Sequence, residues 1–144
     1  YTGNGKKMTK LVGQMALLRK SETEITFSIK ELKTSLEEEK HTIAANFSVQ
    51  TLQDGGLGIV NDELSFSGTI CVSDSTSALL FSTRNPLIKN YALPCAKYIL
   101  AGDLVAVLPE TNSIMEVDFD PDHDRACDNK VALIVNGKRV IYTY

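Results

Sequence analysis

The segment Leu64–Ser73 constrains the fold most, because its apolar and polar residues alternate strictly. Large apolar side chains occupy one set of alternate positions, with Gly68 among them, and small polar residues and Cys71 occupy the other. A period of two places the two sets on opposite faces of a β-strand. The segment therefore predicts a strand with one core face, whose other face meets solvent or a surface rich in hydrogen-bonding groups.

Similar alternation occurs on both sides of this segment. The C-terminal residues predict a hairpin, because Asn136-Gly137 separates two alternating runs and favours the positive φ angles of a type I′ turn. We expect a mainly β fold, an antiparallel sandwich or barrel-like sheet with one or two short helices and an N-terminal arm. The other expected strands are Ile25–Ile29, Thr42–Gln50, Ala78–Thr83, Leu104–Leu108 and Ile114–Phe119.

Three segments are candidates for short helices. Between Met8 and Leu18, apolar residues recur at helical spacing, which predicts a short amphipathic helix. Lys30–His41 has two leucines four residues apart and is expected either as a short helix or as the polar end of a long hairpin. Pro94–Leu104 is expected to hold a further short helix.

Charge divides the chain into a basic arm, residues 1–20, and a single acidic β-rich domain, residues 21–144. The arm holds five of the 15 basic residues and no acidic one, so the remaining 124 residues hold 10 basic and 18 acidic side chains. Such an arm binds nucleic acid, an anionic surface or the acidic body of a neighbouring copy, or is simply solvated. Its basic residues are Lys6, Lys7, Lys10, Arg19 and Lys20.

The acidic part contains four aspartates at alternate positions, Asp118, Asp120, Asp122 and Asp124. In an extended strand they would share one side, where a cation or a basic segment would relieve their repulsion. Oxygen-rich loops of this kind bind calcium, although the sequence departs from an EF-hand loop. Three interpretations stay open: an exposed acidic loop, a calcium site, or a receptor for the basic arm of a neighbouring subunit.

The three cysteines, Cys71, Cys95 and Cys127, are widely spaced and form no zinc motif. We expect free thiols in a reducing compartment, either the cytoplasm or a virus particle made there. No run of about 18 apolar residues predicts a membrane span, and no signal peptide is visible. The first residue, Tyr1, is expected to reflect processing or excision.

No arrangement of residues indicates catalysis. The chain has two histidines, His41 and His123, and lacks a Gly-x-Ser-x-Gly segment and a phosphate-binding glycine loop. We therefore expect a protein that is not an enzyme and that needs no cofactor, unless the acidic loop binds calcium. The alternative is a small β-rich enzyme whose site is built from scattered residues such as His123.

The order of the expected elements resembles one domain of a DNA sliding clamp. Ile25–Ile29 and Lys30–His41 match the first strand and helix of that domain, and Ile43–Ser73 matches its meander. Tyr91–Tyr98 resembles the entry to the second half, which Ile114–Asp118 and Val131–Tyr144 would close. The resemblance implies a DNA-processivity or nucleic-acid-binding domain.

Our first functional hypothesis is a non-enzymatic structural module that self-associates or docks on a protein partner. The polar strand face and the separation of charge motivate it, since an arm and an acidic loop of opposite sign favour a homo-oligomer or a larger assembly. Small β-rich proteins of this kind serve as capsid, decoration or tail components of viral or phage particles, which is an analogy of architecture.

Overall fold

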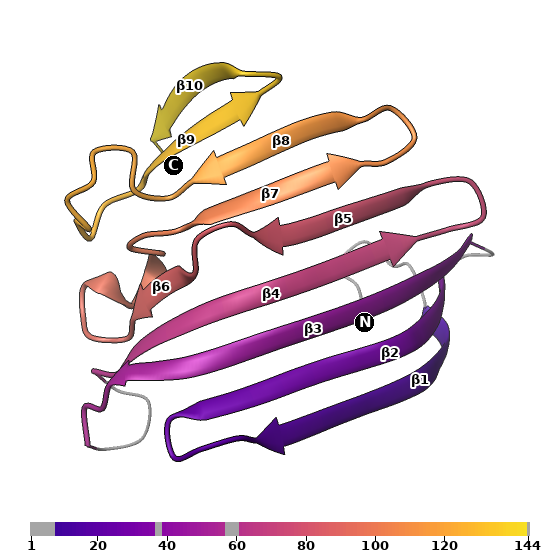
Figure 1. Cartoon of the computed structure of the whole chain (residues 1–144), viewed down its shortest axis with the longest axis horizontal. Helices are drawn as coiled ribbons and strands as arrows, with labels where there is room; N and C mark the ends of the chain where they lie inside the picture. The colour runs from indigo at the N-terminus through magenta and orange to yellow at the C-terminus, as the bar shows by residue number, and fades with distance from the viewer. Residues whose placement is uncertain (1–7, 37–38, 57–60, 144) are drawn as a thin grey trace.

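The computed structural model describes residues 8–36, 39–56 and 61–143, and they form one antiparallel sheet of ten strands (Figure 1). The expected mainly β, antiparallel fold is confirmed, and the sheet is a single open layer. The strands are β1 (Met8–Arg19), β2 (Glu24–Leu36), β3 (Glu39–Gln53), β4 (Glu63–Ser73), β5 (Ala78–Thr83), β6 (Leu87–Asn90), β7 (Asp103–Leu108), β8 (Ser113–Asp118), β9 (Lys130–Val135) and β10 (Lys138–Thr143).

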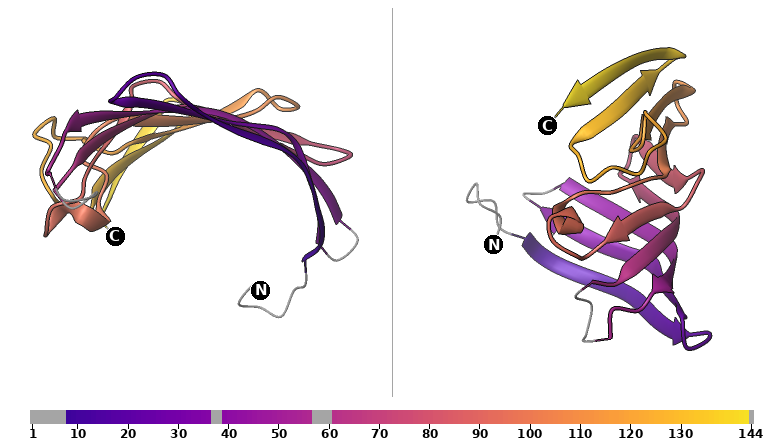
Figure 2. Two further views of the ribbon diagram at one scale, coloured as in Figure 1. Left: turned by 90° about the horizontal axis from the view of Figure 1, so that it is seen from below. Right: turned by 90° about the vertical axis from the view of Figure 1, so that its left-hand side faces the viewer.

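Strands that are close in sequence are neighbours in the sheet, in the order β1-β2-β3-β4-β5-β7-β8-β9-β10. β6 lies off this path and pairs with the first part of β4, whereas β5 pairs with the second part. Residues 91–102 lead from β6 to β7 and include a short 3-10 helix, η1 (Cys95–Lys97). The sheet is curved, and η1 lies on its concave side at one end (Figure 2).

Gly68 marks the point where β4 changes partner. A Cβ atom there would lie 2.8 Å from the Phe47 Cα and 2.9 Å from the Phe47 Cδ1, and would collide with the Asn46 carbonyl oxygen. The Gly68 N–H donates to the Thr83 hydroxyl over 3.0 Å instead of to a strand carbonyl. Glycine is therefore required here by close approach of the neighbouring backbone.

The register of the strands defines two faces. The row of directly opposed residues through the middle of the sheet is apolar in eight strands, β1 to β5 and β7 to β9, and ends at Lys138 of β10; we call the side that carries it the apolar face. The opposite side, which we call the polar face, carries Ser28, Asn46, Thr69 and Ser82 in one row across β2 to β5. The apolar row is Met15, Ile29, Ala45, Ile70, Phe81, Ala106, Met115 and Val135.

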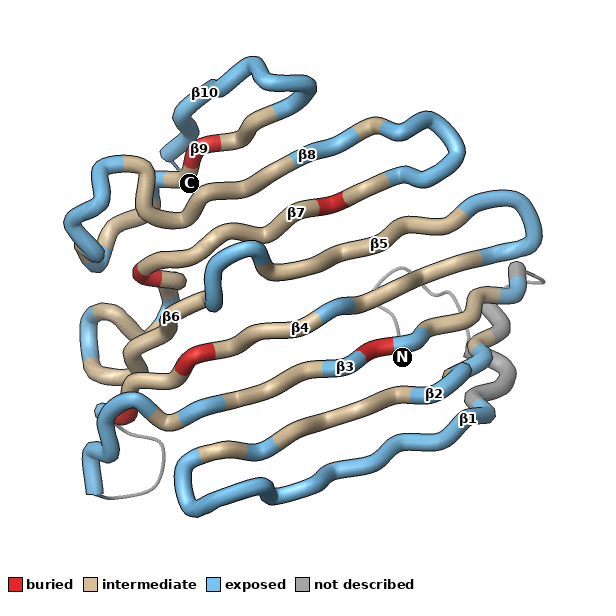
Figure 3. Tube along the Cα trace, in the orientation of Figure 1, coloured by how far each residue is buried: buried red, intermediate tan, exposed pale blue. Residues whose placement is uncertain are grey.

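The core is small because one layer has no second layer to pack against. Among the described residues, the buried apolar side chains are Ala45, Leu100, Ala106 and Ala132, and most other apolar residues are half-buried (Figure 3). Three of these four are alanines, so the large side chains of the sheet stay in contact with solvent. Cross-strand contacts, rather than a closed interior, hold this sheet together.

One of the three helix predictions is wrong, one is confirmed as the short helix η1, and the third gives way to its hairpin alternative. The segment Met8–Leu18 lies in β1, a strand at the edge of the sheet, where neither face is covered and strict alternation is not required. In Pro94–Leu104 the helix is limited to the three residues of η1, and β7 begins at Asp103. For Lys30–His41 the hairpin alternative is correct, because β2 and β3 run antiparallel up to the pair Leu36 and Glu39.

The basic arm is not separate from the sheet over its described part. β1 ends at Arg19, so the boundary at residue 20 falls where β1 turns toward β2. The Lys6 and Lys7 prediction lies outside the described residues. The C-terminal hairpin is confirmed: Asn136 has φ 49° and Gly137 has φ 79°, the two positive angles that a type I′ turn needs.

Candidate interaction surface

The apolar face is the largest uncovered feature of the described chain. The accessible surface of the protein is 9768 Å², whereas a compact monomer of 15.8 kDa would expose about 7,300 Å². The excess of roughly 2,500 Å² fits a single-layer sheet, in which no second described layer covers either face. Ile25 and Met115 of this face remain 39% and 37% exposed, respectively.

The edge strand β1 is the second uncovered feature. Its central residues Val12–Leu18 contain no charged residue and no proline, and no described strand pairs with its outer side. Met15 is 60% exposed and Leu17 is 71% exposed. Edge strands of soluble proteins usually carry charges, prolines or bulges that prevent further pairing, and this stretch has none of these protections.

A β-bulge lies beside this edge, in β2. β2 advances three residues from Ile29 to Leu32 while both of its neighbours advance two, and Glu31 is the extra residue with φ 51°. Gly13 faces the bulge, where a Cβ atom would lie 2.6 Å from the Leu32 Cα. The bulge thus adds curvature to β2, and β1 stays regular from Val12 to Arg19. A second irregularity lies between Met8 and Lys10, where β1 advances two residues and β2 advances one.

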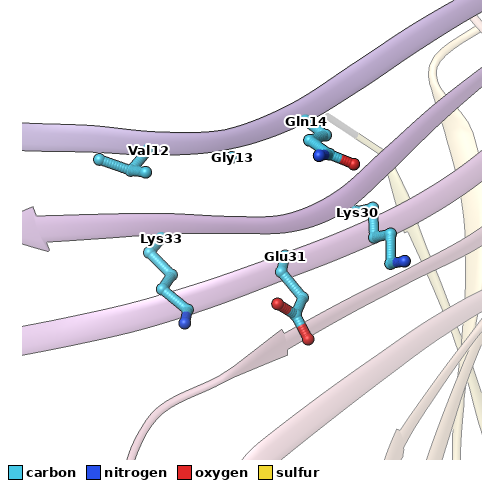
Figure 4. Close-up of a pocket in the computed structure, with 6 residues that line it drawn as sticks. All are labelled: Val12, Gly13, Gln14, Lys30, Glu31 and Lys33. Carbon is cyan, nitrogen blue, oxygen red and sulfur yellow. The ribbon is translucent and has the colours of Figure 1, made fainter.

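The bulge forms a shallow hollow of about 280 Å³, lined by Val12, Gly13, Gln14, Lys30, Glu31 and Lys33 (Figure 4). Lys30, Glu31 and Lys33 extend from β2 toward the same side in this view. The Glu31 carboxylate therefore lies between two lysines, which limits the positive charge that the hollow offers to an anion.

The predicted acidic loop is a series of turns rather than an extended strand. His123 and Arg125 have positive φ angles of 57° and 52°, so the chain reverses within it. The Asp120 carboxylate accepts hydrogen bonds from the N–H groups of Asp124 and Arg125 at 2.9 and 3.1 Å. The expectation that all four carboxylates share one side is wrong, because the turns direct them to different partners.

Cations of the chain itself neutralise two of these carboxylates. Asp122 lies 2.7 Å from the Lys130 ammonium, and this hydrogen bond and ion pair lower the pKa of Asp122 and raise that of Lys130. Asp118 pairs with Arg139 at 3.1 Å and also accepts the Asp120 N–H. Within the described residues, no group of three or more carboxylate, histidine or cysteine side chains is arranged to hold a metal ion.

The expectation of three free thiols is wrong for two of them. Cys95 of η1 and Cys127 of the acidic loop form a disulfide with a Cα–Cα distance of 4.9 Å, and Cys71 remains free. Arg125 adds an ion pair of 2.8 Å to Glu63 of β4. Together these contacts fasten the acidic loop to the β4–β6 end of the sheet.

Arg19 and Lys20, the arm residues whose side chains the structure describes, do not meet the acidic loop within one chain. β1 forms one edge of the sheet, and the acidic loop follows β8 near the other edge. The Arg19 guanidinium folds back and donates to the carbonyls of Ser21 and Glu22 at 3.0 and 3.4 Å. A contact between the arm and the acidic loop stays a prediction.

The fold and its surfaces define a class, a single-layer antiparallel β protein with an open apolar face and an unprotected edge. None of the helices in the described part of the chain has the length and apolarity that crossing a membrane requires. Comparisons with protein-family models, curated proteins and solved structures find no match for this chain. The resemblance to sliding clamps accordingly stays a prediction.

Proposed function

We propose that the chain is a non-enzymatic assembly module that self-associates by covering its apolar face. The observation that carries the proposal is the apolar row, which crosses eight strands without a second described layer above it. A sheet face of this composition is normally packed against another layer. A second copy supplies such a layer without requiring any other gene product.

The area supports an interface between copies. Obligate homodimers bury about 2,000–5,000 Å² in total, or roughly 1,000–2,500 Å² per partner. The excess exposed area of roughly 2,500 Å² per chain covers both faces and the edges of the sheet, and about half of it, as one face would supply, still lies within this range. At about 25 cal/mol per Å², it is large enough to drive association after the costs of ordering are met.

A particle component is the setting that we propose for such a module. Repeated copies that bury one sheet face each form closed rings or lattices, depending on the symmetry of the contact. Viral or phage capsid, decoration and tail proteins use repeated contacts of this kind. The proposal does not depend on this setting, since the self-association is measurable on the isolated protein.

Sedimentation velocity tests the self-association of the full chain. The protein concentration is roughly 1–50 µM, at which an obligate oligomer stays associated. We expect a mass that is a multiple of 15.8 kDa. Met115→Lys places a charge on the apolar face at an exposed position and is expected to weaken association about 100-fold, because the ammonium loses its water in the contact. Ile25→Lys is the second variant, in case the first fails to fold.

The matched control is Thr69→Lys, which adds the same charge to an exposed position of the polar face. We expect this variant to keep the mass of the parent protein. A monomeric parent at every concentration contradicts the proposal, and so does an equal loss of association in Thr69→Lys. Salt-dependent binding of the full chain to duplex DNA would favour the nucleic-acid alternative instead.

A further inference from the structure

We propose that the outer edge of β1 pairs antiparallel with β1 of a second copy of the chain, about a two-fold axis through Met15. The inference rests on the proposed function and names one contact surface within it. The pairing continues each sheet into the next, so that the apolar faces of two copies form one larger apolar surface. β-strand addition at an exposed edge is a common mode of association.

The composition of the edge is the first argument. The residues Val12–Leu18 include no charge and no proline, and the described side chains of β1 from Val12 onward are exposed. Met15 and Leu17 lie on the apolar face, and Val12 and Leu18 lie on the polar face. A strand that exposes apolar groups on both faces and backbone groups along its edge is a template for pairing with another strand.

The direction of the backbone groups is the second argument. The Lys20 N–H donates to the Glu24 carbonyl over 2.9 Å, and the Thr51 N–H donates to the Thr23 carbonyl over 2.8 Å. The alternation of an antiparallel ladder then directs the N–H and C=O groups of Leu18 toward β2 and those of Met15 and Leu17 away from it. These outward groups form the row that a partner strand would bind.

The regularity of β1 is the third argument. The extra residue of the bulge, Glu31, belongs to β2, so the outer side of β1 keeps an unbroken period of two from Val12 to Arg19. Bulges on the edge strand itself are a device against pairing. The β2 bulge curves the sheet and leaves Val12–Arg19 usable, and the irregularity of β1 itself lies outside this stretch, between Met8 and Lys10.

The sequence of β1 selects the register. Directly opposed residues share a face, so the two-fold axis has to pass through a residue rather than between two. An axis through Met15 opposes Val12 to Leu18 on the polar face and Leu17 to Gly13 on the apolar face. An axis through either neighbour of Met15 separates Val12 from Leu18.

The opposite edge of the sheet fits β1 less well. β10 has six residues against the twelve of β1, and its first two residues are Lys138 and Arg139. A contact between β1 and β10 would leave half of β1 unpaired, whereas the axis through Met15 pairs residues 11–19 of the two copies. Self-pairing also closes as a dimer, while β1-to-β10 contacts run head to tail.

Disulfide trapping tests the register. In the Cys71→Ser background, which leaves the Cys95–Cys127 disulfide in place, Met15→Cys puts two thiols on the axis. Their Cα atoms would be about 5.5 Å apart, within the range of a disulfide. Under mild oxidation, we expect most of the Met15→Cys chain to run as a covalent dimer in non-reducing electrophoresis.

The matched controls are Gln14→Cys and Leu17→Cys in the same background. The Gln14 Cα atoms of two copies would be about 8 Å apart, and those of Leu17 farther, so both variants are expected to cross-link at least tenfold less. Equal cross-linking at all three positions would overturn the register. An oligomer by sedimentation whose Met15→Cys variant does not cross-link overturns this inference and leaves the proposed function standing, whereas a monomeric chain overturns both.

A pair of lysine variants separates the two edges. Leu18→Lys is expected to lower the sedimenting mass, because its ammonium group on the polar face would lie opposite Val12 of the second copy. Ile141→Lys places the same charge on the polar face of β10, at a position that is also exposed, and it is expected to keep the parent mass. Loss of mass in Ile141→Lys would overturn self-pairing of β1 in favour of a head-to-tail contact.

Discussion

Removal of the Cys95–Cys127 disulfide tests how the acidic loop is held. The two residues are 32 positions apart, so the bond closes a loop of 33 residues. Loop-closure entropy gives about 3.7 kcal/mol of stabilisation at 25 °C for a loop of this length. For a chain of 144 residues, an unfolding entropy of about 0.3 kcal/mol/K converts this into a fall in melting temperature of roughly 12 °C.

The assay is thermal and urea unfolding of the double variant Cys95→Ser/Cys127→Ser, followed by circular dichroism. Cys71→Ser is the control and is expected to shift the melting temperature by less than about 3 °C, since it removes one half-buried thiol. Thiol titration of the denatured, unreduced protein is expected to find a single thiol, from Cys71. Three titratable thiols, or a double variant as stable as the parent, would refute the reasoning.

Three further perturbations test contacts in other parts of the structure. Gly68→Ala is expected to cost about 2 kcal/mol or more in urea unfolding, because its Cβ would meet the β3 backbone; a cost as small as that of Gly137→Asn, which has open space around it, would contradict this. Hydrogen bonds from Thr76 and Ser77 lower the pKa of Asp74 to about 2, so the contribution of this carboxylate to stability is complete above about pH 4 and is lost toward about pH 2. Asp74→Asn is expected to weaken the pH dependence of the melting temperature in that window, and identical pH profiles of the parent and the variant would count against this. Millimolar calcium or a chelator is expected to leave the melting temperature unchanged, because the carboxylates of Asp120 and Asp122 already have protein partners; a rise that Asp120→Asn abolishes would show a calcium site.

The strands whose faces differ in polarity were predictable from the sequence. β4 combines an apolar face with a small polar face, and the expected strand matches the observed one within a residue at each end. The hairpin at Asn136-Gly137 was predictable for a local reason, since the two residues adopt the positive φ angles by themselves. An alternating sequence appears where the two faces of a strand differ in polarity, and β4 has two such faces.

The disulfide was not predictable, because its cause is not local. Cys95 reaches Cys127 only since the excursion after β6 and the turns after β8 arrive at the same end of the sheet. An odd number of cysteines without paired spacing gave no signal of this meeting. The turns of the acidic loop were not predictable for a similar reason, because the partner of Asp118 lies on β10 and that of Asp122 lies on β9.

The error at β1 has a different origin. Its apolar residues do not alternate, and Val12, Met15 and Leu18 recur at a spacing of three, which is why the pattern resembles a helix. In a strand this spacing places apolar groups on both faces, and no described layer covers either of them. Selection for folding of one chain alone would favour a polar face and a charged edge at such a position. The pattern that defeats the prediction of secondary structure is thus the pattern expected of a strand that is buried between copies, because there both faces and the edge find apolar or backbone partners.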